Sequence, residues 1–392
     1  MPEIEFDTWF ADGDVDWRGQ LAEIGQQHRF FRIAGESTIW VTRYDDMREI
    51  MHDWQLFSPN DSAGRGAGNS RDDGTKSADI YLLPPNEEGA RLLDIRHGLM
   101  PMFSPAEARR WAPRMHEVAR DLVSGFVGQG EVDAVSAFAR RYFPYIGAEW
   151  IGAPREDWDW LTDLEGRAFV APSNPQSRML DLQNDAMMAI IDYCKHLVAL
   201  KRKSPDNSLT SFALTLELEG RPITDAEAAA IVAEACLGSG HTVAAQIGYV
   251  LKYLSQHEAL RRRVAHGSAE ELDRIFEELL RMFALWGHER WVTRDTEFHG
   301  LSLKKDVLLF LAWPLGNFDR SPNRHLTFGT GPHQCLGRHW ARVSGTVAIA
   351  EWHRQIPEYE LEPGTSVVEQ IYAGVGYHAL PLRWAVDPST AS

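Results

Sequence analysis

The spacing of apolar and polar residues is mixed over the first sixty positions. WRGQLAEIGQQ and MREIMHDW have helical spacing, whereas FFRIAGESTIWVTRY predicts two short β runs around Gly35, rich in β-branched and aromatic residues. Residues 61–79 are rich in Gly, Ser and Asp and have no hydrophobic period. A loop this long inside a compact domain is usually functional or disordered.

Helical spacing dominates from about residue 104 to 282. Capping signals open three of these helices, at Ser104-Pro105, Thr224-Asp225 and Ala269-Glu270. After about residue 290 the pattern changes to short β segments, a glycine-rich loop, one more helix over roughly 337–353, and terminal strands and turns. We therefore predict a mainly α fold with small sheets at both ends. No repeat or linker divides the chain, so we expect a single domain over residues 1–392.

Composition narrows the class of protein. The chain of 392 residues is 44% hydrophobic and carries a formal net charge of −16, which argues against a general nucleic-acid binder. No run of about twenty apolar residues predicts a membrane span, and the first residues lack the basic and apolar regions of a secretory signal. Three widely separated cysteines fit a reducing compartment. We expect a cytoplasmic protein.

The segment His325–Arg342, HLTFGTGPHQCLGRHWAR, is the most informative in the chain. Its glycines predict a turn-rich loop whose backbone lies close to a large flat ligand and adopts positive φ where needed. The loop brings Cys335 to the start of a helix, where exposed amides favour a thiolate over a thiol. A thiolate is a ligand for haem iron and favours O–O cleavage. The alternative is a buried structural cysteine in a turn.

This segment resembles the haem-binding signature of the cytochromes P450, phenylalanine-glycine-x-glycine-x-histidine-x-cysteine-x-glycine. Six residues match it, and Ala341 follows as in the family: Phe328, Gly329, Gly331, His333, Cys335 and Gly337. The resemblance implies a helical bundle with small β-sheets and haem b between distal and proximal helices. It also implies that Cys335 is the iron ligand and that Phe328, Gly329, His333 and Gly337 contact the cofactor.

Two further constellations fit the resemblance. Glu278 and Arg281, three apart on a predicted helix, lie on one face and resemble the glutamate-x-x-arginine pair that braces the proximal side. Arg290 occupies the position of an arginine that binds a haem propionate. The segment 277–305 is similar to the camphor-hydroxylase branch of the bacterial family.

The helix before Phe103 resembles the one that offers a histidine and, four residues on, an arginine to the propionates. In this register Arg96 takes the arginine position, but Leu92 stands where the histidine belongs. His97 and Arg91 are candidate substitutes. Buried anionic propionates need cationic or hydrogen-bonding partners. The expected set is His333, Arg290 and Arg96.

The predicted helix 231–253 contains Gly238-Ser-Gly-His-Thr242. Each interior glycine costs about 1 kcal/mol relative to alanine, so a compensating role is expected. Thr242 is placed to bond the carbonyl of Gly238 and to bend the helix, which would leave a groove over the iron. Close helix packing is the alternative. By resemblance this is the distal helix, and Thr242 matches the oxygen-side threonine.

His241 departs from the family, which usually has an acid immediately before that threonine. Histidine also relays protons. Three alternatives follow: retained monooxygenase chemistry, an unusual or peroxide-driven oxidation, or a histidine that points away. A second departure is the shortened meander before Phe318, which bears on stability and on docking of the redox partner.

By resemblance, substrate contacts come from residues 61–84, 169–179, 235–242 and the C-terminal turn at 372–375. The candidate residues are Leu237, Gly238, Leu285, Trp286 and Tyr372. They indicate a small apolar or aromatic substrate in a desolvated pocket.

We therefore predict a P450 monooxygenase in which Thr242 and His241 handle protons and a separate ferredoxin or flavin protein supplies electrons. The expected partners include neither nucleic acid nor membrane. A peroxygenase or an atypical enzyme for coupling, dehydration or isomerisation is an alternative. A non-catalytic scaffold would be free to lose the cysteine loop, which is intact. A helical hydrolase is disfavoured, since neither GxSxG nor HExxH occurs.

Overall fold

The computed structural model describes most of the chain. The described residues are 1–6, 10–12, 16–60, 80–169, 178–285, 287–318, 324–371 and 376–386, and for 10–12 and 178–183 only the backbone is described. Structural statements below refer to these ranges.

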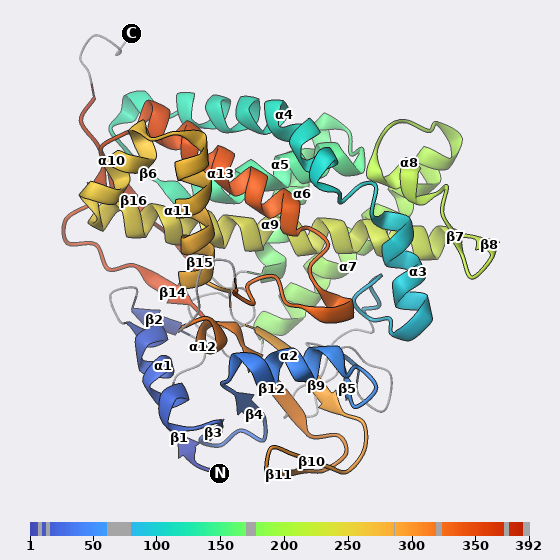
Figure 1. Ribbon diagram of the computed structural model, residues 1–392. Helices are drawn as coiled ribbons and strands as arrows, with labels where there is room; N and C mark the ends of the chain where they lie inside the picture. The colour runs from blue at the N-terminus through green and yellow to red at the C-terminus, as the bar shows by residue number, and fades with distance from the viewer. Residues whose placement is uncertain are drawn as a thin grey trace.

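Helices make up most of the described chain, as predicted. They are α1 (Trp17–Gln27), α2 (Tyr44–His52), α3 (Gly89–Leu99), α4 (Pro105–Ser124), α5 (Arg140–Ile151), α6 (Trp158–Phe169), α7 (Arg178–Lys203), α8 (Leu209–Ala213), α9 (Asp225–Gln256), α10 (Glu258–His266), α11 (Ala269–Met282), α12 (Trp313–Asn317) and α13 (Arg338–Gln355). Shorter turns of 3-10 or π type are η1 (Val127–Gln129), η2 (Val135–Ala139), η3 (Arg155–Asp157) and η4 (Gly331–His333). In Figure 1, α4, α5, α9 and α13 run side by side in one half of the molecule.

The strands form one larger sheet and several small ones. They are β1 (Glu3–Ile4), β2 (Phe10–Asp12), β3 (Phe30–Ile33), β4 (Ile39–Val41), β5 (Phe57–Ser58), β6 (Glu131–Asp133), β7 (Glu217–Leu218), β8 (Arg221–Pro222), β9 (Gly287–Val292), β10 (Thr296–Phe298), β11 (Leu301–Leu303), β12 (Leu308–Ala312), β13 (Glu360–Leu361), β14 (Val368–Gln370), β15 (Gly376–Tyr377) and β16 (Pro381–Arg383). The largest sheet has the order β1-β3-β4-β12-β9-β5, so the N-terminal segment pairs with residues from far along the chain. The two β runs predicted around Gly35 are β3 and β4 of this sheet, and Gly35 has a φ of 83° at their turn.

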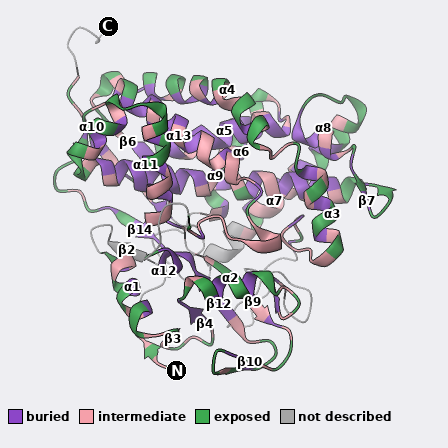
Figure 2. Ribbon diagram, in the orientation of Figure 1, coloured by how far each residue is buried: buried purple, intermediate pink, exposed green. Residues whose placement is uncertain are grey.

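Two hydrophobic cores organise the molecule (Figure 2). The larger core lies among the helices and includes Tyr142, Tyr249 and Trp352, and the smaller one lies between the main sheet and the helices α1, α2 and α12. Leu326 belongs to the sheet core and Leu336 to the helical core. The cysteine loop therefore joins the two cores.

Helix α9 passes through the helical core. A capping box between Thr224 and Glu227 starts it, with each side chain bonded to the other's backbone N–H. By length and composition α9 is the one described helix apolar enough to cross a membrane, but 61% of its apolar window is buried inside the protein. This is the burial expected of a core helix in a globular protein.

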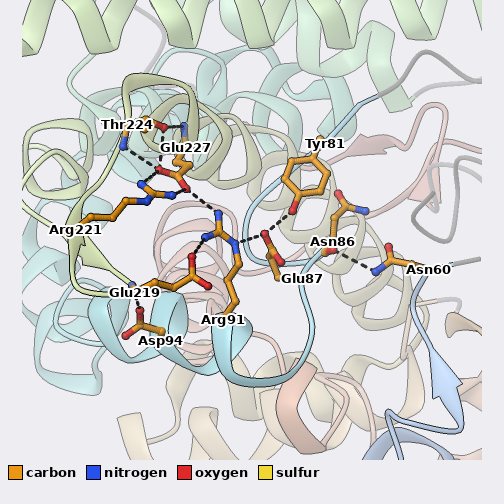
Figure 3. Close-up of polar contacts among 10 residues, drawn as sticks. All are labelled: Asn60, Tyr81, Asn86, Glu87, Arg91, Asp94, Glu219, Arg221, Thr224 and Glu227. Carbon is orange, nitrogen blue, oxygen red and sulfur yellow. Dashed lines mark hydrogen bonds and ion pairs between the residues drawn. The ribbon is translucent and has the colours of Figure 1, made fainter. Parts of the chain in front are cut away.

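A network of charged side chains fixes α3 against the start of α9 (Figure 3). The guanidinium of Arg91 on α3 donates to Glu87, to Glu219 in the β7–β8 turn, and to Glu227 of the capping box, at 2.6, 2.7 and 2.7 Å. Arg221 also binds Glu227 in a bidentate pair. Because Arg91 is engaged here, its suggested role as a substitute for the missing histidine at position 92 is wrong.

The packing of α13 against α11 generates a prediction of stability. A Cβ on Gly345 of α13 would lie 2.1 Å from the ring of the buried Phe276 on α11. We expect Gly345→Ala to lower the free energy of unfolding by about 1–3 kcal/mol, because the core must move to admit it. Denaturant unfolding of the purified protein measures this change.

Gly166→Ala on α6 is the matched control, because a Cβ there meets no atom within 4 Å. It should stabilise the helix by about 0.5–1 kcal/mol. Equal unfolding free energies for the two alanine variants would contradict this account of the packing.

Candidate functional site

The cysteine loop has a compact backbone fold. The N–H of Cys335 donates to the carbonyl of Phe328 at 2.9 Å, and the N–H of Gly329 donates to that of Leu326 at 2.7 Å. Gly329 and Gly331 have φ values of 62° and 69°, where side chains are disfavoured. At Gly331 a Cβ would also lie only 2.6 Å from the carbonyl oxygen of Met51 in α2. The predicted positive φ values are thus confirmed, and at Gly331 the backbone lies close to α2.

The environment of Cys335 differs from that of the other two cysteines. Its side chain is accessible to solvent, whereas Cys194 and Cys236 are buried. Burial nevertheless raises the pKa of the Cys335 thiol above its ordinary value, and the N–H of Gly337 and the charges of Arg338 and Arg96 oppose this. The predicted effect of the helix start on the thiol is present, but burial outweighs it. A cation at the sulfur would be needed to hold the thiolate.

Helix α9 presents its glycine-rich turn to solvent-accessible space. Gly238 is exposed although its neighbour Leu237 is buried. The hydroxyl of Thr242 donates to the carbonyl oxygen of Gly238 at 3.1 Å, as the sequence predicts. Residues four apart share a helix face, so Thr242 lies on the face that Gly238 leaves open.

Glu234 lies on this same face, one turn before Gly238. Its side chain is half-buried, and a Cβ on Gly238 would lie 3.1 Å from the Glu234 Oε1. Burial raises the pKa of Glu234 to about 8. Its charge also contributes to raising the pKa of the Cys335 thiol, so the two groups are close enough to interact electrostatically. Sequence analysis missed Glu234, although its spacing of eight residues from Thr242 was a usable signal.

A group of basic side chains lies beside Cys335 without a matching anion. Arg290 on β9 is 3% exposed, and burial lowers its pKa to about 10. His333 has a buried Nε2 with no hydrogen-bond partner, and burial together with Arg290, His288 and Arg96 lowers its pKa to about 3. Arg96 donates to the carbonyl of Gln334 at 2.6 Å. Within the described ranges no carboxylate forms an ion pair with Arg290, so this cluster has the charge that a bound anion requires.

His288 is a second residue of this cluster that sequence analysis missed. It is solvent-accessible, yet burial, followed by the charge of Arg290, lowers its pKa to about 4. His288 and Arg290 are two positions apart on β9, so they point to the same side of the sheet. This alternation was visible in the sequence once Arg290 had been singled out.

These residues fit a haem group. An accessible cysteine sulfur is available to the iron, and Arg290, Arg96 and the unpartnered His333 would hold the two anionic propionates. The ring of Phe328 is half-buried, with the guanidinium of Arg342 at 4.4 Å from its centroid. A Cβ on Gly337 would meet the Cys335 sulfur at 3.8 Å, an ordinary contact.

The predicted brace is present as an ion pair. Arg281 donates to both carboxylate oxygens of Glu278, at 2.9 and 2.6 Å, and to the carbonyl of Asn317 at 2.5 Å. It therefore ties α11 to the end of α12. The predicted shortening of the meander concerns the chain around Phe318 and residues 319–323, and the latter lie outside the described residues.

His241 lies beside the glycine-rich turn in a different environment. Its ring stacks on Phe169 of α6 with centroids 3.8 Å apart. Burial lowers its pKa to about 4, and its Nδ1 is buried without a hydrogen-bond partner. The residue lines a pocket between α6, α9 and β15 whose walls also include Glu165 and Gly240.

The second glycine of this turn accommodates a carboxyl group. A Cβ on Gly240 would lie 1.7 Å from the Glu165 Oε2, so any larger residue here would require the buried Glu165 carboxyl to move. The other oxygen of Glu165 accepts from the Cys236 thiol at 3.3 Å. Burial raises the pKa of Glu165 to about 8. The two glycines thus each leave room for an acid, Glu234 at Gly238 and Glu165 at Gly240.

The structure describes only some of the remaining expected site residues. Leu237 is buried and Leu285 is half-buried against the helical core. Several expected positions lie outside the described residues: Trp286, Tyr372 with the rest of 372–375, and the segments 61–79 and 170–177. His97, the other suggested substitute at the propionates, is exposed and has no side-chain hydrogen bond among the described residues.

Known proteins similar to this chain are cytochromes P450. A probable cytochrome P450 127A1 of Sinorhizobium fredii is 25% identical over 90% of this chain and 84% of its own length. The mycinamicin IV hydroxylase/epoxidase of Micromonospora griseorubida is 26% identical, with 88% of each chain covered. Among solved structures, CYP101J2 aligns with a TM-score of 0.84 at 24% identity, over 98% of this chain and 97% of the other. No family model matches the sequence.

The relatives support an oxidoreductase of the cytochrome P450 kind. Relatives of this name, matched along almost the whole length of the chain, bear out its resemblance to the cytochromes P450. CYP101J2 and CYP101C1, with TM-scores of 0.84 and 0.82, share the fold of this chain.

The carboxyl of Glu165 generates a prediction of pH dependence. The native protein retains this proton up to about pH 8, whereas an unfolded chain loses it near pH 4–5. Unfolding therefore releases a proton between these values, and the free energy of unfolding should fall as pH rises through this window. Glu165→Gln should flatten that fall by a few kcal/mol at most.

Unfolding free energies at pH 5, 6, 7 and 8 measure this difference between the wild type and the variant. The exposed Glu156→Gln is the control and should keep the wild-type slope. Parallel pH profiles for wild type and Glu165→Gln would show that the carboxyl titrates equally in both states.

Proposed function

We propose that the protein is a cytoplasmic, single-domain monooxygenase that binds haem b and inserts one oxygen atom from O2 into a small apolar or aromatic substrate. The observation that carries this proposal is the solvent-accessible sulfur of Cys335 beside buried basic groups that lack an anion. Relatives named hydroxylases and monooxygenases support the reaction class.

In this proposal the residues of the chain have separate roles. Cys335 would hold the iron through its sulfur, and Arg290, His333 and Arg96 would hold the propionates. Haem supplies the binding and reduction of O2 and the oxidation of substrate, while the protein supplies orientation and electrostatics. The Thr242 hydroxyl, held by the Gly238 carbonyl, is placed to donate and accept a proton on the open face of α9.

His241 is a poor proton donor in its present environment. With a pKa near 4 it is neutral at physiological pH, and its ring is held against Phe169. Imidazole in this state passes protons only as a relay between other groups. This favours an enzyme in which proton delivery at Thr242 is slower than in relatives with an acid at this position.

A separate electron donor is part of this proposal. Basic side chains surround His339 on α13. Burial lowers its pKa most, followed by the charges of Arg338 and Arg342 on the same helix and of Arg109 on α4, so these residues lie close together. These residues make a basic region next to the cysteine loop, in which Arg342 is already paired with Glu277. An acidic ferredoxin or flavin protein has the complementary charge for this face.

The alternative function is a peroxide-using or atypical P450, which catalyses coupling, dehydration or isomerisation. Neutral His241 is the observation that favours it. Turnover with reductase and NAD(P)H, compared with turnover by hydrogen peroxide alone, distinguishes the two functions. Product only with peroxide would replace the monooxygenase proposal by this alternative.

Cys335→Ala should abolish the red-shifted CO absorption band of the reduced protein, because that band requires a sulfur ligand. The absorption spectrum of the dithionite-reduced, CO-treated protein is the measurement. Cys194→Ala is the control, since Cys194 is fully buried in the helical core and should leave the band in place. A wild-type protein without the band, or a Cys335→Ala protein that retains it, would refute the proposal.

His241→Asp should raise the share of NAD(P)H electrons that end in product, because it restores an ionisable acid next to Thr242. Hydrogen peroxide released per NAD(P)H consumed measures this share and should fall about twofold or more. His241→Asn, which cannot carry a proton, should not improve on the wild type. Equal peroxide release in all three proteins would remove any proton role for position 241.

A further inference from the structure

A cavity with polar walls lies where α5, α6 and α9 pack together. Neither Cys335 nor Thr242 is among the described residues that line it. Its volume is about 40 Å³, enough for roughly three water molecules. The polar side chains in its walls are Arg140, Thr162, Glu165, His241 and Tyr377. The cavity is therefore both large enough and polar enough to hold water.

Three of these residues bring unpaired polar atoms to the cavity. The Oγ1 of Thr162, the Oε2 of Glu165 and the Nδ1 of His241 are buried and have no hydrogen-bond partner in the described part of the chain. Buried polar atoms of this kind are costly unless they bond to water. Because the three residues line one cavity, water inside it would join them into a single hydrogen-bonded chain.

The carboxyl of Glu165 is held at this cavity by its contacts with α9. Glu165 is 5% exposed, and its Oε1 accepts from the Cys236 thiol at 3.3 Å. Its Oε2 lies where a Cβ on Gly240 would be, at 1.7 Å from that position. Gly240 directly precedes His241 in the helix. The unpaired oxygen is thus placed against the turn of α9 that carries the imidazole.

The groups around Glu165 leave its proton in place at neutral pH. Burial raises its pKa to about 8, and the bond from the Cys236 thiol opposes this. Its other titratable neighbours are Cys194 on α7, His241 on α9, Arg140 on α5 and Tyr377 on β15. Of these only Arg140 is charged at neutral pH, and its pKa responds to burial and to Asp133. Glu165 is therefore an acid with a proton to donate below about pH 8.

His241 links the cavity to the open face of α9. It is the one polar side chain that this helix contributes to the cavity, among Gly240, His241, Ala244, Ala245 and Gly248. Its Nδ1 is buried, but the side chain as a whole remains partly accessible. Thr242 follows it directly, and the Thr242 hydroxyl bonds the carbonyl of Gly238 at 3.1 Å. A neutral imidazole accepts a proton at one nitrogen and releases one from the other, so it can relay protons between two sides.

We propose that Glu165 supplies protons, through water in this cavity and the imidazole of His241, to the hydroxyl of Thr242. The inference rests on the proposed haem enzyme, and it gives Glu165 a role that acts through His241. In the relay the O–H bond of Glu165 breaks, a proton passes through water to one ring nitrogen, and the other nitrogen releases its proton toward Thr242. Water returns a proton to the carboxylate, and no electrons move. An acid on α6 thereby takes the place of the one expected at position 241.

The first test follows the carboxyl of Glu165 in the haem-loaded protein without turnover. The infrared C=O band of a protonated carboxyl, taken as the difference between wild type and Glu165→Gln, should be present at pH 7. It should disappear as the pH rises through about 8. In D2O the band should shift within the mixing time, because cavity water exchanges the proton. A carboxyl that is ionised at pH 7, or whose proton does not exchange with solvent, overturns the inference.

The second test measures NADPH oxidation without substrate, in which O2 takes up two electrons and two protons to form H2O2. A ferredoxin and its reductase, chosen because they generate the CO band with NADPH, supply the electrons. The proteins compared are the wild type, Glu165→Gln, His241→Asn and the double variant. Asp163→Asn is the matched control, because Asp163 lies on the same helix with its side chain 67% exposed.

At pH 7 each single variant should slow NADPH oxidation about tenfold or more, with a larger ratio of the rates in H2O and D2O. The double variant should be no slower than the slower single variant, because both residues act on one route. The wild-type rate should fall as the pH rises through about 8, where Glu165 loses its proton. Both single variants should lack this fall, so the test does not depend on the stability of Glu165→Gln alone.

The control Asp163→Asn should keep the wild-type rate and pH profile. The inference is overturned if the losses of the two single variants multiply in the double variant, if Glu165→Gln keeps the wild-type pH profile, or if Asp163→Asn has the same effect.

The CO spectrum separates this inference from the proposed function. A protein that shows the thiolate band but whose NADPH oxidation does not depend on Glu165 refutes the inference alone. A protein without the band refutes the proposed function and, with it, the inference.

Discussion

The crossing of the cysteine loop between two hydrophobic cores is the constraint on which the site depends. Leu326 is anchored in the sheet core and Leu336 in the helical core, so the intervening residues have little freedom to move. Positive-φ glycines and the bond from Cys335 to Phe328 complete the turn. The sulfur is thereby held at the boundary between the two halves, where α9 from one half and β9 from the other supply the remaining groups.

Charge inside this boundary is distributed in two separate regions. The basic groups Arg96, Arg290 and His333 gather on the side of the sheet and the cysteine loop. The carboxyl of Glu234 on α9 is close enough to the sulfur to interact with it electrostatically. The raised pKa of Glu234 leaves this carboxyl mostly protonated at neutral pH. Arg290 is buried and forms no ion pair within the described chain, and a bound anion would compensate its charge.

The glycines of α9 show how local cost and tertiary gain are balanced. Each glycine weakens the helix by about 1 kcal/mol, and each makes room for a carboxyl that an alanine would displace. Sequence reasoning recognised the cost and the Thr242 bond, and it offered a groove over the iron or close helix packing as the compensation. Glu234 lies one turn earlier on the same helix, whereas Glu165 comes from α6. Only Glu165 required knowledge of which helix packs there.

Local signals in the sequence determined the mainly helical fold, the cysteine loop, the brace and the threonine bond, because turn residues, capping residues and i,i+3 or i,i+4 spacing act over a few residues. Tertiary structure alone decided that Arg91 pairs with Glu219 and Glu227 and that His241 stacks on Phe169. The spacing of His288 from Arg290 and of Glu234 from Thr242 was visible in the sequence, but the burial that shifts their pKa values was not. Those outcomes depend on which elements meet across long sequence separations, and on burial, which sets the charge of each group only after the chain has packed.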